Sequence, residues 1–119
     1  FTLSAHSEFK LGIENIPSKF MSHYVDNKIP IGLVTNQTGK DQKGNRTIDV
    51  LLKKGFKVTA LYAPEHGVEG KIELERDVKD SLDGKTKIPV YSLYMNGSGK
   101  KIDPLMIKNI EAFFFDIQD

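Results

Sequence analysis

The sequence predicts an α/β fold in which a parallel, Rossmann-like sheet is flanked by helices. Short apolar runs, which are typical of buried strands, alternate with segments of helical spacing along the 119 residues. Such alternation implies right-handed crossovers between parallel strands. A polar cluster directly follows each of the four apolar runs, as in sheets that bind ligands outside the carboxyl ends of their strands. The length suits one domain with a moderate core.

Two of the predicted helices lie in the first half of the chain. The first covers residues 17–27, because Pro17 suits a first helical turn and apolar residues recur around it at helical spacing. The second begins at Asn45 or Thr47, either of which can act as its cap. Gly55 ends this helix, since glycine readily adopts the backbone conformation that follows a helix C-terminus.

The third predicted helix opens with Asp103 as its cap and Pro104 at its first position, and it continues through Ile110. Strands are predicted at residues 29–34, 57–62, 88–93 and 112–115. The run at 112–115 is apolar without alternation, which is typical of a strand buried on both faces. Residues 64–87 are charged and too long for a simple loop, so we expect a short helix or a mobile lid there.

Composition excludes several classes of function. A net charge of +1 is too near neutral to indicate electrostatic capture of nucleic acid. The absence of cysteine excludes disulfides, zinc thiolate sites and thiol catalysis. The longest apolar runs are far shorter than a membrane span. We therefore expect a globular chain that has neither a nucleic-acid partner nor a membrane span.

The sharpest polar cluster is the Ala-Pro-Glu-His-Gly sequence at residues 63–67. Pro64 stiffens the turn and Gly67 permits a backbone conformation that other residues resist, so together they can hold Glu65 over the sheet edge. A carboxylate there can donate or accept a proton, with His66 beside it as a second catalytic candidate. The alternative is a solvated turn whose carboxylate caps a helix. His66 has no partner at His-x-x-x-His spacing, so we expect no metal site.

Amide side chains follow the first predicted strand. Asn36 and Gln37 can each donate and accept hydrogen bonds, which suits sugar hydroxyls or an N-acetyl group. The alternative is local turn closure, which asparagine often provides. Gly39 and Gly44 have the spacing of a phosphate-binding loop, but Asn and Arg at 45–46 stand where such a loop needs Lys and Ser or Thr. We therefore expect no nucleotide cofactor.

Carboxylates follow the last predicted strand. Asp116 and Asp119 either belong to a site or cap a following helix. Glycoside hydrolysis commonly uses two carboxyl groups, and Glu65 with Asp116 can form such a pair across neighbouring strand ends. Tyr94, at the end of the third predicted strand, can stack on a sugar ring, although such tyrosines are also ordinary core-edge residues.

Five sequence blocks resemble, in order, those of the exo-β-N-acetylmuramidases of the NamZ type. They are Ile-Gly-Leu-Val-Thr-Asn-Gln-Thr-Gly at 31–39, Thr-Ile-Asp at 47–49, Ala-Pro-Glu-His-Gly at 63–67, Ile-Pro-Val-Tyr-Ser-Leu-Tyr at 88–94 and Phe-Asp-Ile-Gln-Asp at 115–119. The resemblance implies that residues 1–119 are the N-terminal part of a Rossmann-like catalytic domain, and that a C-terminal remainder completes the active-site cleft. One departure is Glu69, which stands where the family usually has an arginine, and it bears on which sugar is bound.

The resemblance also implies an activity, namely release of terminal N-acetylmuramic acid from peptidoglycan fragments outside the cytoplasm of a bacterium. It implies Glu65 as the catalytic carboxylate, in a pocket lined by Asn36, Gln37, Asp116 and Asp119. The expected partners are a peptidoglycan-derived sugar and the rest of the protein's own chain. Retaining, inverting and N-acetyl-assisted mechanisms all remain open. The alternatives are a non-catalytic glycan-binding or surface protein on the same scaffold and, less favoured, a signalling or nucleotide-binding module.

Overall fold

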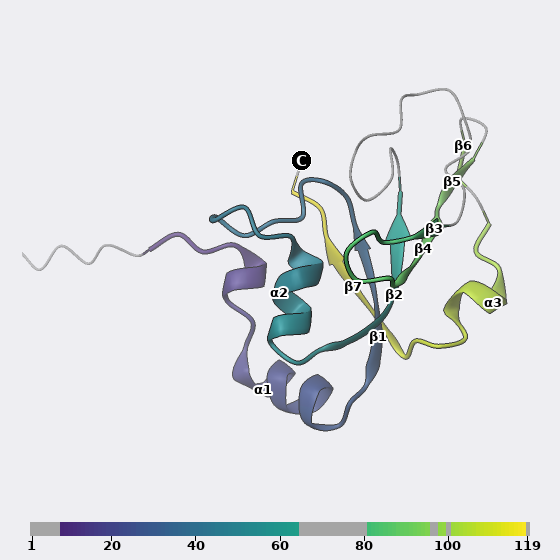
Figure 1. Cartoon of the computed structure of the whole chain (residues 1–119). Helices are drawn as coiled ribbons and strands as arrows, with labels where there is room; N and C mark the ends of the chain where they lie inside the picture. The colour runs from purple at the N-terminus through teal and green to yellow at the C-terminus, as the bar shows by residue number, and fades with distance from the viewer. Residues whose placement is uncertain (1–7, 65–80, 96–97, 100, 119) are drawn as a thin grey trace, which may run out of the picture.

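The computed structural model describes residues 8–64, 81–95, 98–99 and 101–118 of the chain and contains a five-stranded, mostly parallel sheet (Figure 1). The strand order is β3-β4-β2-β1-β7. The parallel strands are β1 (Pro30–Thr35), β2 (Lys57–Ala63), β4 (Pro89–Ser92) and β7 (Ala112–Asp116), and β3 (Ser81–Leu82) pairs antiparallel with β4. A separate antiparallel pair joins β5 (Tyr94–Met95) to β6 (Ser98–Gly99). The predicted α/β class, with a parallel sheet and flanking helices, is confirmed.

The order in which successive strands are added to the sheet reverses at β1. From β1 the chain moves to β2 and then to β4, whereas β7 returns to the opposite side of β1. β1 and β7 are in continuous parallel register, from Ile31 beside Ala112 to Thr35 beside Asp116. Thus the polar residues Thr35 and Asp116, which lie one position beyond the predicted strand ends, are the last pair of the ladder. In open α/β sheets such a reversal marks the place where ligands bind.

One face of the sheet carries the main hydrophobic core. Its helical segments are η1 (Gly12–Glu14), α1 (Ser18–Phe20), the π-helical η2 (Met21–Asp26) and α2 (Thr47–Lys53). Ile31 and Leu33 from β1 and Ile48 and Leu51 from α2 are almost completely buried in this core. The ring of Phe114 in β7 joins it by edge contacts with the aromatic rings around it. Burial of apolar surface here supplies the main stabilisation of the sheet.

The helix boundaries differ from the predicted ones in instructive ways. Pro17 precedes the first helix instead of lying inside it, since its backbone is extended. Neither Asn45 nor Thr47 caps α2, where Arg46 is the N-cap residue. The Asn45 side chain instead binds Asp41, and the Thr47 hydroxyl instead binds Asp116, so both are engaged elsewhere.

Two helix signals read from the sequence are confirmed. Gly55 follows α2 with a φ of 93°, a conformation that favours glycine. Asp103 caps α3 (Pro104–Ile107), since its Oδ1 accepts a hydrogen bond from the backbone of Leu105 at 2.8 Å. This helix is shorter than predicted and ends before Ile110.

The opposite face of the sheet has a smaller core around Tyr62. This ring is fully buried, and its hydroxyl donates to the main-chain oxygen of Met106 in α3 at 2.5 Å. Burial, with a smaller effect of the neighbouring Tyr91, raises the pKa of the Tyr62 phenol to about 12.

The prediction that the last strand is buried on both faces is wrong, because Phe113 and Phe115 on this face are 48% and 72% exposed. In the described part of the chain β7 is an edge strand, and α3 covers only part of this face.

An ion pair joins α2 to the turn that follows β3. This turn belongs to residues 64–87, for which the sequence predicts a short helix or a mobile lid. Residues 65–80 of that segment lie outside the described residues, and residues 81–82 form β3. The side chain of Asp83 is 2% exposed and accepts from Arg46 Nη1 at 2.7 Å and Nη2 at 3.2 Å. Burial by itself would raise the pKa of Asp83, but hydrogen bonds from Arg46 and Thr86 outweigh it and hold the pKa well below its usual range. The pair therefore stabilises the fold only while Asp83 is ionised.

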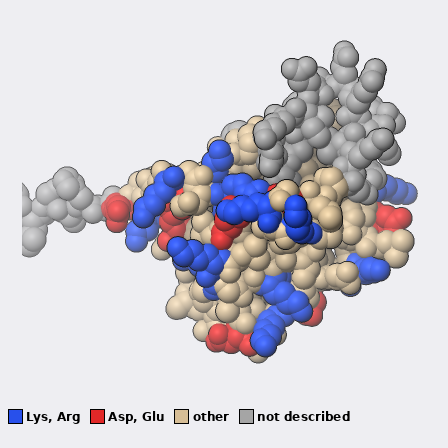
Figure 2. All heavy atoms as spheres, viewed as in Figure 1, with Lys and Arg blue, Asp and Glu red and all other residues tan. Residues whose placement is uncertain are grey.

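Charges elsewhere on the surface are mixed. On the face shown in Figure 2, Lys and Arg side chains are spread over the described surface with Asp and Glu side chains among them. This arrangement gives no single-sign field over that face. In the part of the chain that the structure describes, no helix has the length and apolar character that crossing a membrane requires.

The Asp83→Asn variant is expected to lower the free energy of unfolding by about 2–4 kcal/mol near pH 7, because it leaves Arg46 with a weakened partner. The pKa of Asp83 is lowered from 3.8 on folding, so its contribution is present above about pH 4 and is lost as the pH falls through the folded-state value. Urea denaturation between pH 7 and pH 2 measures this. The acid-dependent loss of stability should shrink in the variant, and equal pH dependence in both proteins would contradict this assignment.

A control is available in the same network. Lys85 donates to Asp49 at 2.9 Å but its side chain is 69% exposed. The Lys85→Ala change is therefore expected to cost less than about 1 kcal/mol.

Candidate functional site

The candidate site lies where the carboxyl ends of β1 and β7 meet. The Thr35 side chain, 2% exposed, donates from Oγ1 to the main-chain oxygen of Asp116 at 2.9 Å. This bond extends the β1–β7 ladder by one side-chain link and fixes the two strand ends side by side. The polar groups beyond the strand ends are consequently held on a rigid base.

The first wall of the site is the turn that follows β1. The side-chain oxygen of Asn36 accepts from the backbone nitrogen of Thr38 at 2.9 Å and from its hydroxyl at 2.6 Å. The Thr38 hydroxyl oxygen also accepts from the backbone nitrogen of Gln118 at 2.9 Å. The side-chain oxygen of Asn36 therefore closes the local turn, which is the alternative role that the sequence offers for this residue. The amide nitrogen of Asn36 has no hydrogen-bond partner among the described residues, which leaves it able to donate to a ligand.

Gly39 allows this turn to close against β7. A Cβ atom at this position would lie 2.1 Å from Thr35 Oγ1 and 3.0 Å from the main-chain oxygen of Asp116. The backbone oxygen of Gly39 accepts from the nitrogen of Thr47 at 2.9 Å, which ties the turn to the start of α2. Only a residue without a side chain fits between these groups.

The rest of the loop is braced by two carboxylates outside the site. Glu14 of η1 accepts from the Gln42 backbone nitrogen at 2.8 Å and from its side-chain nitrogen at 2.6 Å. Asp41 accepts from the Asn45 side chain at 2.8 Å. Hydrogen bonds from Gln42 lower the pKa of Glu14, and hydrogen bonds from Asn45 lower that of Asp41. Both carboxylates are thereby kept ionised as anchors of the loop.

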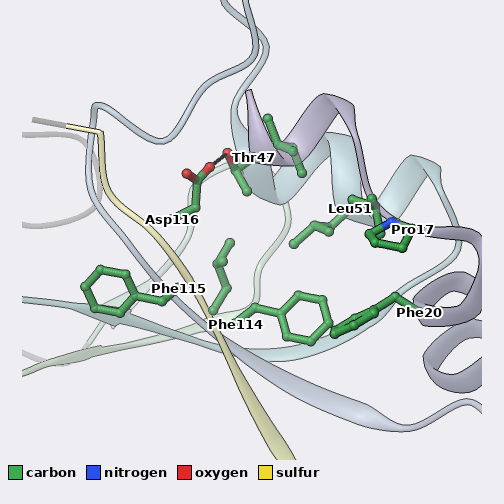
Figure 3. A pocket seen from close by; sticks show the side chains of 11 residues that line it. Pro17, Phe20, Thr47, Leu51, Phe114, Phe115 and Asp116 are labelled. Carbon is green, nitrogen blue, oxygen red and sulfur yellow. Dashed lines mark hydrogen bonds between the residues drawn. The ribbon is translucent and has the colours of Figure 1, made fainter. Parts of the chain in front are cut away.

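The carboxylate of Asp116 is held at the centre of the site. Its Oδ2 accepts a hydrogen bond from the Thr47 hydroxyl (Figure 3). The side-chain nitrogen of Gln118 lies 3.2 Å from Oδ1 and 3.4 Å from Oδ2, and the same nitrogen donates to the main-chain oxygen of Lys40 at 2.9 Å. The carboxylate therefore has a defined orientation, with acceptor capacity to spare.

A cavity of about 240 Å³ adjoins Asp116. In Figure 3 the Asp116 and Thr47 side chains lie together at one side of it, and the rings of Phe114 and Phe20 and the side chain of Leu51 line the remainder. The cavity is therefore mainly apolar with a polar margin, a combination common in small-molecule sites.

The structure brings only some of the predicted site residues together. Asn36 and Asp116 lie in one hydrogen-bonded cluster, and Gln37 is exposed in the same turn. Tyr94 follows β4, which is separated from β1 by β2, and it pairs within the β5–β6 hairpin. Glu65, His66 and Asp119 lie outside the described residues. The strand that leads to Glu65 ends at Ala63, directly beside β1 in the sheet.

Sequence reasoning missed the residues that hold Asp116 in place. The sequence identifies Thr35 only as a member of the 31–39 block, Thr47 as a possible helix cap and Gln118 as a member of the 115–119 block. A threonine at the last position of a strand, or at the first position of a helix, is a weak signal because its hydroxyl has many possible local partners. Only the pairing of β1 with β7 shows that Thr35, Thr47 and Gln118 all contact Asp116.

Within the residues that the structure describes, no group of three or more His, Asp or Glu side chains converges in a way that could hold a metal ion. The chemistry of the cluster is that of amide, hydroxyl and carboxylate groups at a strand reversal. Such groups at the reversal of an α/β sheet are typical of ligand-binding α/β proteins, and they are of the kind that can hydrogen-bond a polyhydroxylated ligand.

Comparison with known proteins narrows this class to one family. The family model for "Exo-beta-N-acetylmuramidase NamZ, N-terminal" matches residues 31–119, and the chain belongs to this family. Over 90 residues the chain is 44% identical to the peptidoglycan beta-N-acetylmuramidase NamZ of Bacillus subtilis (strain 168). That match covers 75% of this chain and 21% of the relative. The resemblance inferred from the five blocks is therefore confirmed, and the chain spans about a fifth of the relative's length.

Solved structures support the same assignment. A crystal structure of a DUF1343 family protein of Bacteroides fragilis NCTC 9343 matches with a TM-score of 0.71 at 38% identity, covering 92% of this chain and 26% of that one. A second DUF1343 protein of the same organism matches with a TM-score of 0.67 at 28% identity, covering 95% and 26%. The α/β fold is thus shared with these proteins over nearly the whole of this chain.

The Gly39→Ala variant is expected to lower the free energy of unfolding by about 1–3 kcal/mol, because its methyl group would overlap the Thr35 hydroxyl. Gly84 is the matched control, since a Cβ there would meet nothing within 4 Å. Urea denaturation of the two variants compares them directly. Equal stability of Gly39→Ala and Gly84→Ala would show that the turn does not close against β7 as described.

Proposed function

We propose that the protein is a glycoside hydrolase that releases terminal N-acetylmuramic acid from peptidoglycan fragments outside the bacterial cytoplasm. The observation that carries the proposal is a hydrogen-bonding cluster at the β1–β7 reversal in a chain 44% identical, over 90 residues, to a peptidoglycan beta-N-acetylmuramidase. The shared sequence includes the stretch from which the cluster is built, since the family match covers residues 31–119.

The chemistry of the cluster supports a sugar ligand. The amide nitrogen of Asn36, which has no partner among the described residues, can donate, and the oriented carboxylate of Asp116 can accept. Together they can bind neighbouring groups of a sugar ring. The exposed Gln37 can add a further polar contact, and Tyr94 and Asp119 are proposed as outer parts of the binding surface. The apolar cavity beside Asp116 offers room for a nonpolar substituent or ring face.

Glu65 is the proposed reactive group. In the sequence it comes two positions after Ala63, the last residue of β2, and β2 pairs with β1. As a general acid, Glu65 would give its proton to the glycosidic oxygen as the bond to the anomeric carbon breaks and water adds to that carbon. As a nucleophile, it would form a bond to that carbon as the glycosidic oxygen leaves, and water would then break the new bond. His66 is the proposed second catalytic residue. The remaining four-fifths of a relative's length is proposed to complete the cleft, so activity is expected only of the whole protein.

The Glu65→Gln variant of the full-length protein is expected to lose about 10²–10⁴-fold in kcat on a chromogenic N-acetylmuramide, because the amide cannot transfer the proton. Glu111→Gln is the matched control. Glu111 is exposed and directly precedes β7, so it lies at the amino ends of the strands, away from the candidate site. Full turnover by Glu65→Gln would remove Glu65 as the catalyst.

Turnover by the wild-type protein tests the function itself. Hydrolysis of the N-acetylmuramide in preference to the matching N-acetylglucosaminide supports the proposal and shows that Glu69 does not repel the lactyl group. Binding of the sugar without hydrolysis would instead indicate a glycan-binding protein on the same scaffold, and preference for the glucosaminide would assign another sugar.

A further inference from the structure

Thr47 occupies an unusual position for a buried hydroxyl. It is the first residue of α2 and is only 2% exposed, yet its hydroxyl makes no capping bond to the helix backbone. The hydroxyl crosses instead to the carboxylate of Asp116, a residue 69 positions away in the chain. Because Arg46 and not Thr47 is the N-cap residue, the bond to Asp116 is unrelated to helix capping, and its direct effect is to hold the orientation of that carboxylate.

The backbone of Thr47 is fixed independently of its side chain. Its nitrogen donates to the oxygen of Gly39 at 2.9 Å, so the start of α2 is tied to the turn after β1. The preceding residue, Arg46, is held by Asp49 at 3.0 Å and by the buried Asp83 at 2.7 Å. The hydroxyl therefore approaches Asp116 from a base that is anchored on two sides.

The two oxygens of the Asp116 carboxylate have different surroundings. Oδ2 accepts from the Thr47 hydroxyl and also lies 3.4 Å from the side-chain nitrogen of Gln118. Oδ1 has a 3.2 Å contact with that nitrogen and no other hydrogen-bond contact among the described residues. Figure 3 shows one oxygen directed at Thr47 and the other pointing away from it. Thr47 thus selects which oxygen remains available to a ligand, and Oδ1 is that oxygen.

We propose that Thr47 is a positioning residue, whose hydroxyl orients the Asp116 carboxylate so that Oδ1 accepts a hydrogen bond from a hydroxyl or amide N–H group of the bound sugar. This inference rests on the proposed function for the sugar that it names. Under this proposal Thr47 does not contact the sugar, because its hydroxyl donates its hydrogen to Oδ2 of Asp116. A purely structural bond between α2 and β7 is the alternative, and the two differ in what removal of the hydroxyl does to substrate binding.

The test uses the full-length protein and three threonine variants. Thr47→Val replaces the hydroxyl with a methyl group of similar size, and Thr47→Ser restores the hydroxyl. Thr59→Val is the matched control. The Thr59 hydroxyl also joins a strand to a distant residue, since it donates to the main-chain oxygen of Asn109 at 2.7 Å, and among the described residues it has no hydrogen bond to the candidate site.

On the chromogenic N-acetylmuramide, Thr47→Val is expected to lower kcat/KM by about 10–100-fold, mainly through KM, because a misdirected carboxylate loses its contact with the sugar. Thr47→Ser should recover most of the loss, and Thr59→Val should lower the unfolding temperature without changing KM. In the Asp116→Ala background, Thr47→Val should have little further effect, since Thr47 acts through that carboxylate. Additive losses, or an unchanged KM in a folded Thr47→Val protein, would overturn the proposal.

A second readout needs no turnover. The ¹³C chemical shift of the Asp116 side-chain carboxyl group reports its hydrogen bonding directly, and it should change in Thr47→Val but not in Thr59→Val. An unchanged shift in Thr47→Val overturns the positioning role whatever the substrate. The two proposals can fail separately. If the shift changes in Thr47→Val but the wild-type protein hydrolyses neither N-acetylmuramide nor N-acetylglucosaminide, Thr47 still orients Asp116 and only the proposed function is rejected.

Discussion

The parallel pairing of β1 with β7 is the constraint on which the site depends. These strands are far apart in the sequence, and their register places Thr35 directly beside Asp116 at the end of the ladder. The Thr35 hydroxyl then fixes the main chain of Asp116, and Gly39 leaves the space in which the turn can close over that bond. A shift of register by one residue would turn the Asp116 side chain to the other face and dissolve the cluster.

The cluster is built from many modest hydrogen bonds instead of one strong interaction. Thr38, Thr47 and Gln118 each connect the end of β7 to the turn after β1 or to α2, and each bond of this kind contributes about 1 kcal/mol. Because these bonds share partners, removal of one is expected to loosen the others. Rigidity at this edge is what a glycoside-binding surface needs, since an oriented donor or acceptor loses little freedom when the sugar binds.

Much of the fold follows from local signals in the sequence. The strands at Ile31 and Val58, the cap at Asp103 and the helix stop at Gly55 were predictable because each depends on near neighbours. The polar residues at the ends of β1 and β7, which form the candidate site, were predictable for the same reason. What could not be predicted depends on contacts between distant segments: the hydroxyl of Thr47 binds Asp116 instead of capping α2. In the described structure β7 lies at an edge, so its apolar run is only half covered.

The central claim is that the carboxyl edge between β1 and β7 binds the sugar, and an NMR titration of the full-length protein with N-acetylmuramic acid tests it most directly. The backbone amide signals of Asn36, Thr38 and Gln118 should shift together and saturate at one ligand concentration range, because these groups share the hydrogen-bonded cluster at that edge. Signals of the turn at Gly84 and Lys85, which lies outside the cluster, should remain in place. Saturable shifts confined to residues away from the β1–β7 edge would contradict the account.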